Sequence, residues 1–147
     1  MPERMFFSVQ ARTPAPPEAV YRLLADGASW PDWSPIGSFR LEREGPVGGE
    51  SAGAIRVFTT SGLRNREELL ELRPPDRLSY TSLSGLPIRG HRADVELTAR
   101  DGGTAISWRE EFVPWLPGSG PVLRWLLRRF VQRCADGLAA AAGQLPG

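Results

Sequence analysis

The sequence predicts an α+β fold in which an antiparallel sheet wraps around one long C-terminal helix. Three observations predict it: a strand-like start followed by short helical segments, a series of strand-like runs separated by turns, and a final amphipathic segment. Antiparallel strands need their apolar face covered, and the terminal helix is the only element long enough to cover it. A curved sheet around one helix leaves a space between them, and we expect that space to hold a ligand.

The N-terminal part begins with a strand over residues 5–12, where polar and apolar residues alternate loosely. A helix follows, because two adjacent prolines suit its first turn and Gly27 ends it. The next stretch, SWPDWSP (29–35), is kept short and bent by its two prolines. We expect it to close one end of the fold, with Trp30 packed on the first helix and Trp33 at the mouth of the cavity.

Six further strand-like runs are separated by turns rich in Gly, Pro, Asn and Asp. They cover residues 38–44, 53–60, 66–73, 77–83, 91–100 and 104–113. A helix over residues 119–142 follows, with apolar residues recurring at helical spacing on one broad face. At about 1.5 Å per residue it is long enough to cross a whole sheet. No repeat or long linker divides the chain, so we expect a single domain over residues 1–147.

Alternation along the strands predicts which side chains face the helix, because residues two apart share a face. The inward rows are Ile106, Trp108, Glu110 and Phe112; His91, Ala93, Val95 and Leu97; Leu78, Tyr80 and Ser82; and Glu68, Leu70 and Leu72. The opposite rows carry mostly charged and hydroxyl side chains, as a solvent face does. The run 53–60 fits either phase, so the direction of Arg56 and Phe58 stays open.

Besides Ser82, four polar side chains fall in these inward rows: Glu68, Tyr80, His91 and Glu110. Burying a polar group is costly unless it is paired or hydrated, so two interpretations stand side by side. In one, the two glutamates and the histidine lie at a hydrated rim near strand ends. In the other, the four are catalytic, with His91 or a carboxylate as base and Tyr80 as proton donor. The side chains expected to bind ligand are Trp33, Arg56, Phe58, Leu70, Tyr80, Val95, Trp108, Leu126 and Phe130.

Composition excludes several kinds of chemistry. All 18 basic residues are arginines, so no lysine is available for a Schiff base. Cys134 is the only cysteine and His91 the only histidine, which excludes an internal disulfide and a Cys- or His-rich metal cluster. The glycine-rich stretches match no phosphate-binding loop, and a net charge of +1 gives no argument for nucleic-acid binding. We therefore expect no cofactor, no metal and no nucleic-acid partner.

The start of the chain lacks the apolar core of a signal peptide, and no run approaches a membrane span, so we expect a cytoplasmic protein. The last helix gathers arginines near its first half and places Trp125 on its polar side. Such a helix suits an anionic membrane or a protein partner. We favour the alternative, a solvated arginine face with Trp125 packed under the loop VPWLPGSGP (113–121). The oligomeric state stays open.

Three stretches resemble the START-like superfamily, also called SRPBCC, which includes polyketide cyclase/dehydrase-like proteins. APPEAVYRLLADGASWPDWSP (15–35) is similar to its first helix and W-P-x-W-x-P pattern. LELRPPDRLSY (70–80) is similar to a strand–turn–strand unit of the superfamily, and GGTAISWREEF (102–112) to a later strand. The resemblance implies a helix-grip fold, in which a sheet of about seven strands encloses a deep hydrophobic cavity. It transfers no catalytic signature to this sequence.

Three hypotheses about function follow. Members of the superfamily bind lipids, sterols, quinones or polyketides, so the first is binding of a hydrophobic or aromatic small molecule in the cavity. The second is a cofactor-independent cyclase or dehydratase that acts on a polyketide-like substrate through the four polar residues. The third is a contact of the arginine-rich helix with a membrane or protein partner.

Overall fold

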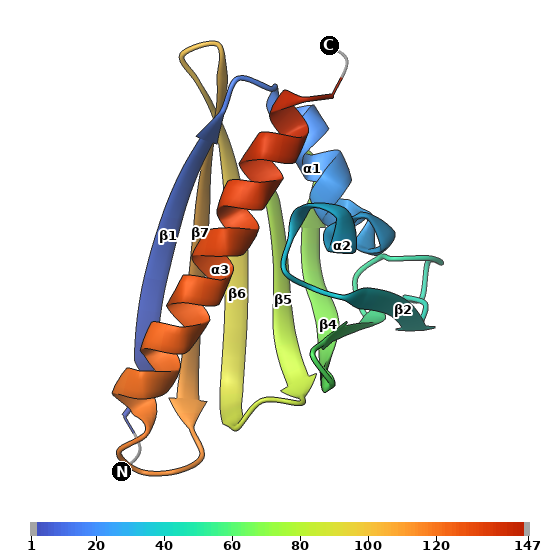
Figure 1. Ribbon diagram of the computed structural model, residues 1–147. Helices are drawn as coiled ribbons and strands as arrows, with labels where there is room; N and C mark the ends of the chain where they lie inside the picture. Colours follow the sequence, from blue (N-terminus) through green and yellow to red (C-terminus); the bar gives the residue numbers. More distant parts are fainter. Residues whose placement is uncertain (1–2, 146–147) are drawn as a thin grey trace.

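The computed structural model describes residues 3–145 and shows a seven-stranded antiparallel sheet that wraps around one long helix (Figure 1). The elements in chain order are β1 (Met5–Thr13), α1 (Pro17–Ala25), the 3-10 turn η1 (Gly27–Ser29), α2 (Trp30–Trp33), β2 (Ser38–Arg43), β3 (Ile55–Thr60), β4 (Leu63–Arg73), β5 (Arg77–Ser84), β6 (Ile88–Arg100), β7 (Gly103–Pro114) and α3 (Gly120–Gly143).

The strands follow one another as a meander, with one exception. The sheet order is β1-β7-β6-β5-β4-β3-β2, so only β1 is displaced, and it pairs with β7 from Met5↔Phe112 to Thr13↔Thr104. Figure 1 shows α3 running along one face of the sheet, with α1 and α2 beside its C-terminal half. The predicted α+β fold, with short helices after the first strand and a long C-terminal helix on a curved sheet, is confirmed.

The SWPDWSP stretch forms the single turn α2, which packs against both other helices. The indole Nε1 of Trp30 donates a hydrogen bond to the carbonyl oxygen of Leu24 in α1, at 3.1 Å. On the other side, a Cβ atom placed on Gly137 of α3 would overlap the carbonyl oxygen of Trp33. A glycine is therefore needed where the backbone of α2 crosses α3.

The two halves of α3 have different surroundings. Its second half is held in the core by six buried side chains: Val131, Cys134, Ala135, Leu138, Ala139 and Ala142. In its first half, Val122, Trp125 and Leu126 are exposed. The sequence had placed Val122 and Leu126 on the apolar face of the helix. Trp125 is 58% exposed, so the expectation that it packs under the preceding loop is wrong. α1 and α2 lie beside the second half, whereas the first half packs on β1, where Arg124 Nε donates to the carbonyl oxygen of Phe6 at 2.6 Å.

The inward rows expected for β5, β6 and β7 are confirmed. In β4 the expected row is wrong at Glu68 and Leu70, whereas Leu72 packs against the core as expected. Glu67 and Leu69 are buried, and Glu68 and Leu70 are more exposed. The register between β4 and β5 shifts at Arg66/Glu67 and again at Leu69/Glu71. A bulge exchanges the two faces of the strand that carries it. Leu72 lies beyond the second bulge, so its inward direction does not predict which of Glu67 and Glu68 faces inward.

Candidate functional site

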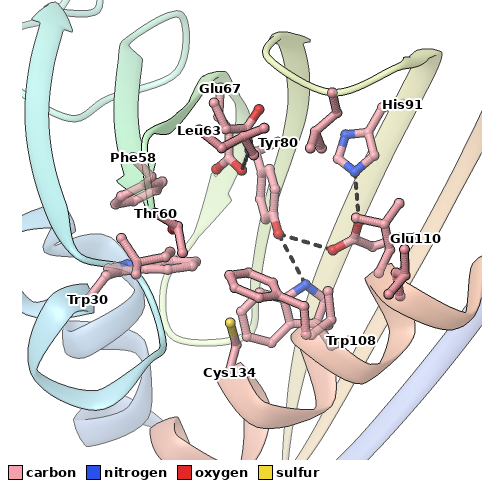
Figure 2. A pocket seen from close by; sticks show the side chains of 17 residues that line it. Trp30, Phe58, Thr60, Leu63, Glu67, Tyr80, His91, Trp108, Glu110 and Cys134 are labelled. Atoms are coloured by element: carbon pink, nitrogen blue, oxygen red, sulfur yellow. Dashed lines mark hydrogen bonds and ion pairs between the residues drawn. The ribbon is translucent and has the colours of Figure 1, made fainter. Parts of the chain in front are cut away.

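A cavity of about 270 Å³ lies between the first half of α3 and the sheet (Figure 2). Most of its walls are apolar, and their side chains are Trp30, Ile36, Phe58, Leu63, Leu86, Trp108, Leu126, Leu127, Phe130 and Val131. The lining residues Leu63 and Leu126 are also exposed. The cavity therefore opens between the β3–β4 turn and α3. Its polar lining comes mainly from β4 to β7.

Four side chains form a hydrogen-bonded chain along the β5–β7 wall. Trp108 Nε1 donates to the hydroxyl of Tyr80 at 3.2 Å, and that hydroxyl donates to Glu110 Oε2 at 3.2 Å. The second oxygen of the carboxyl group, Oε1, lies 2.7 Å from Nε2 of His91 (Figure 2). All four residues are buried. Because both carboxyl oxygens are bonded, these groups satisfy one another away from bulk water.

The backbone determines how the imidazole of His91 is held. Its Nδ1 accepts a hydrogen bond from the N–H of Ser82 at 2.8 Å, so the proton of the neutral ring is on Nε2 and points at Glu110. Burial lowers the pKa of His91, but the carboxylates of Glu110, Glu67 and Glu111, with Glu110 the strongest, together raise this pKa overall. A proton on Nδ1 would oppose the N–H of Ser82. His91 thus orients Glu110, and charging the ring requires the Ser82 contact to open.

Glu67 is a second buried carboxyl group at the cavity, and it has a free oxygen. Asn65 Nδ2 donates to its Oε2 at 2.7 Å, and the hydroxyl of Ser82 donates to Asn65 Oδ1 at 2.6 Å. Within residues 3–145, no donor reaches Oε1. Burial raises the pKa of Glu67 to about 7, with the charge of Glu110 adding to the effect and His91 opposing it. A carboxyl group close to half protonation at neutral pH therefore faces the cavity.

Arg56 points toward the helices but does not reach the cavity. Its Nη2 donates to the carbonyl oxygens of Leu24 and Ala25 at 3.1 and 2.7 Å, and its Nε lies 2.6 Å from Glu50 Oε2. The last carbonyls of a helix have no partner within the helix, so the guanidinium satisfies the end of α1. The side chain is 1% exposed. Arg56, expected to bind ligand, is thus committed to α1 and Glu50.

The structure brings most of the expected site residues together. Those that line the cavity are Phe58, Tyr80, His91, Trp108, Glu110, Leu126 and Phe130. The burial of His91 and Glu110 shows that the interpretation as a hydrated rim is wrong for these two. The residues that do not line the cavity are Trp33, Arg56, Glu68, Leu70 and Val95. Glu68 and Leu70 lie outside the cavity because of the β4 bulge between Leu69 and Glu71, and Val95 is fully buried in the core.

Trp30 takes the place that the sequence assigned to Trp33. Its ring stacks on Phe58 at a centroid distance of 4.9 Å and meets Trp108 edge-on at 5.8 Å. Trp33 is buried instead, where its Nε1 donates to the hydroxyl of Ser29 at 3.0 Å. Two residues three apart lie on neighbouring positions of a helical turn, so only the packing of α2 decides which one reaches the cavity.

Sequence reasoning missed Glu67, Asn65 and Cys134 as cavity residues. The first two share a strand face with Leu69, but no residue marks the bulges that turn this face inward. Burial raises the pKa of the Cys134 thiol, as expected of a structural cysteine. Across residues 3–145, no group of three or more His, Cys, Asp or Glu side chains is placed to hold a metal ion.

Comparisons with known proteins agree with this architecture. The family model described as "Polyketide cyclase / dehydrase and lipid transport" matches residues 6–143. Among similar solved structures, a START superfamily protein from Mycobacterium smegmatis has a TM-score of 0.80 at 14% identity, over 96% of this chain and 99% of that chain. XoxI from Bacillus cereus has a TM-score of 0.75 at 18% identity, over 96% of both chains.

A third structure, Ara h 8.0201, has a TM-score of 0.76 at 17% identity, over 95% of this chain and 98% of that chain. At these identities the structural likeness shows the fold alone. The comparison with curated proteins found no match. The family match covers nearly the whole chain and agrees with the START-like resemblance of its motifs. The chain therefore belongs to the polyketide cyclase/dehydrase and lipid transport family.

Proposed function

We propose that this protein binds a small apolar or aromatic molecule that presents a hydrogen-bond donor to the carboxyl groups in the cavity. One observation carries the proposal: two buried carboxyl groups, Glu67 and Glu110, line an otherwise mostly apolar cavity, and Glu67 keeps one oxygen free. The apolar walls select the body of the ligand, and the free oxygen selects its polar end.

The size and shape of the cavity favour a compact, flat ligand. An apolar cavity of about 150 Å³ accepts benzene, and this cavity of about 270 Å³ has room for a molecule of two fused rings. The rings of Trp30, Phe58 and Trp108 form its aromatic walls. Aromatic walls make large contacts with a flat ligand and lose little conformational freedom when they do so.

The charges around the cavity disfavour an acidic ligand. No arginine lines it, the chain has no lysine, and the nearby guanidinium of Arg56 is already bonded to α1 and Glu50. A ligand carboxylate would therefore lie beside Glu67 and Glu110 without a free cation. A hydroxyl or ammonium group would instead donate to Glu67 Oε1.

A matched set of ligands tests this polarity. Calorimetry with naphthalenemethanol, naphthalenemethylamine and naphthoate compares a hydroxyl, an ammonium and a carboxylate on the same two rings. We expect the first two to bind at least about tenfold more tightly than naphthoate, since a hydrogen bond to a charged group contributes about 1.5–3 kcal/mol. Equal or tighter binding of naphthoate would contradict the donor preference. The absence of binding by all three would contradict the small-molecule function.

Two variants connect the preference to Glu67. Glu67→Gln removes the carboxylate but keeps the size of the side chain, and we expect it to weaken naphthalenemethylamine most. Glu68→Gln is the matched control, because Glu68 is the next residue on β4 and lies outside the cavity. A variant at Glu68 should leave all three affinities unchanged. Native mass spectrometry of the purified protein adds a direct search for a bound natural ligand.

A second candidate function, proton abstraction next to a carbonyl group, is favoured by the pKa of Glu67. A general base works best when its pKa is near the working pH, and this one is about 7. The Glu67 carboxylate would take a proton from the carbon beside the carbonyl and return it to the enolate. Thr60, whose side chain lines the same cavity, offers a hydroxyl to the enolate oxygen. This is the proton transfer that cyclase and dehydratase reactions require.

Isotope exchange tests this second function without knowledge of the substrate. Tetralone in heavy water exchanges its acidic C–H protons for deuterium, and NMR follows the loss of signal. We expect the wild type and Glu68→Gln to accelerate the exchange and Glu67→Gln to lose the acceleration. Equal acceleration by the wild type and Glu67→Gln, or none by the wild type, would contradict a role of Glu67 as base.

A further inference from the structure

We propose that the end of the molecule at which the cavity opens docks on an anionic lipid bilayer. Three segments form this end, and we call them the rim: residues 61–64 around the β3–β4 turn, residues 83–89 around the β5–β6 turn, and residues 115–129, which lead into α3 and form its first half. Figure 1 places both turns and the start of α3 at the same, lower end of the fold.

The rim is continuous around the cavity. The backbone N–H of Trp115 donates to the carbonyl oxygen of Pro87 at 3.0 Å, which joins the β7–α3 connection to the β5–β6 turn. Each segment also contributes leucine to the lining: Leu63 and Leu86 from the two turns, and Leu126 and Leu127 from α3. A surface that covers the rim would therefore also cover the opening of the cavity.

Exposed apolar side chains concentrate on the rim. Ten large apolar side chains are exposed in the part of the chain that the structure describes, and seven belong to the rim: Leu63, Leu83, Trp115, Leu116, Val122, Trp125 and Leu126. The two tryptophans are 63% and 58% exposed. Apolar residues scattered singly over a surface need no explanation, but such a concentration marks a surface that binds an apolar partner.

The charges of the rim identify this partner as anionic. The rim contains Arg64, Arg89, Arg124, Arg128 and Arg129 and none of the 17 acidic residues, although the whole chain is nearly neutral. None of these five arginines forms an ion pair within residues 3–145. Five positive charges without a carboxylate partner, beside exposed tryptophans, suit the charged headgroups of an anionic bilayer and its apolar interior. One of them, Arg124, also donates a hydrogen bond to the carbonyl oxygen of Phe6.

The first half of α3 combines both features on one helical face. Val122, Trp125, Leu126 and Arg129 follow one another at helical spacing, and the Arg129 guanidinium lies 5.5 Å from the centre of the Trp125 ring. No helix in the described part of the chain is long and apolar enough to cross a membrane. The proposed contact is therefore a surface contact, in which Trp and Leu side chains enter the headgroup region while arginines meet lipid phosphates.

Vesicle flotation tests the docking on the full chain without any cavity ligand. We expect the wild type to float with vesicles of phosphatidylcholine and phosphatidylglycerol and to stay unbound with phosphatidylcholine alone. Arg129→Glu should weaken binding by more than about fivefold, since each positive charge near the surface contributes about that factor. Trp115→Ser and Trp125→Ser should each weaken it by a similar factor. Their unfolding transitions, compared with that of the wild type, show whether these variants remain folded.

Two controls separate the rim from general charge and apolarity. Arg100→Glu makes the same charge reversal at an exposed position on the β6–β7 hairpin, and Val47→Ser removes an exposed apolar side chain from the β2–β3 loop. Both should bind vesicles as the wild type does. Equal losses in the controls and the rim variants would overturn the proposal, as would no flotation of the wild type. A wild type that forms dimers through the rim and ignores vesicles would identify a second copy as the occupant and overturn it too.

Discussion

Replacing Glu67 with glutamine should change how the stability of the protein depends on pH. Burial raises the pKa of this carboxyl group to about 7 in the folded state, against an ordinary value of 4.5. The folded protein therefore holds a proton on Glu67 over a pH range in which the unfolded chain has lost it. Stability falls as the pH rises from the lower value to the higher, and the loss is complete above the folded pKa.

The size of the effect follows from the gap of about 2.5 between the two pKa values. At about 1.36 kcal/mol for each unit, the charged carboxylate lowers the free energy of unfolding by about 3 kcal/mol at a pH of about 8. Glutamine cannot lose a proton and escapes this loss. Between about pH 4 and about pH 8, the wild type should thus lose about 3 kcal/mol relative to Glu67→Gln.

Urea unfolding followed by tryptophan fluorescence at several pH values measures this difference. Glu68→Gln is again the matched control, since Glu68 lies outside the cavity on the same strand, and it should follow the wild type. Parallel curves for the wild type and Glu67→Gln would show that Glu67 is not buried as a carboxyl group, and the inward phase of β4 would be refuted.

Three further predictions concern the packing around the cavity. Gly137→Ala should lower the free energy of unfolding by about 1–3 kcal/mol, because the added methyl group overlaps the backbone at Trp33; an unchanged urea midpoint would show that α2 shifts freely. Arg56→Met should cost about 3–5 kcal/mol, because it leaves Glu50 and the end of α1 without their partner; thermal unfolding at neutral pH measures it, and a stable variant would contradict this role. Cys134 should react with a thiol reagent only after unfolding, since burial raises the pKa of its thiol; rapid modification of the folded protein would contradict its burial.

Much of the site followed from alternation where the strands are regular. In β6, His91 begins a regular stretch in which Ala93, Val95 and Leu97 share its inward face without interruption. Tyr80 and Glu110 were placed correctly for the same reason. In β4 the same rule predicted Glu68 instead of Glu67. Alternation is counted along one strand, whereas a bulge is a mismatch in the pairing of two strands and leaves no mark in the sequence of either one.

The order of the elements, the turns between them and the superfamily follow from local signals in the sequence. Proline and glycine restrict the backbone wherever they occur, and apolar periodicity reports one buried face of a strand or helix. The contents of the cavity depend instead on contacts between distant segments. Trp30 reaches it because Gly137 lets α2 approach α3, and Arg56 misses it because α1 ends beside its guanidinium. The rim likewise exists only because folding brings three segments to one end, where five arginines gather without an acid while the whole chain is almost neutral.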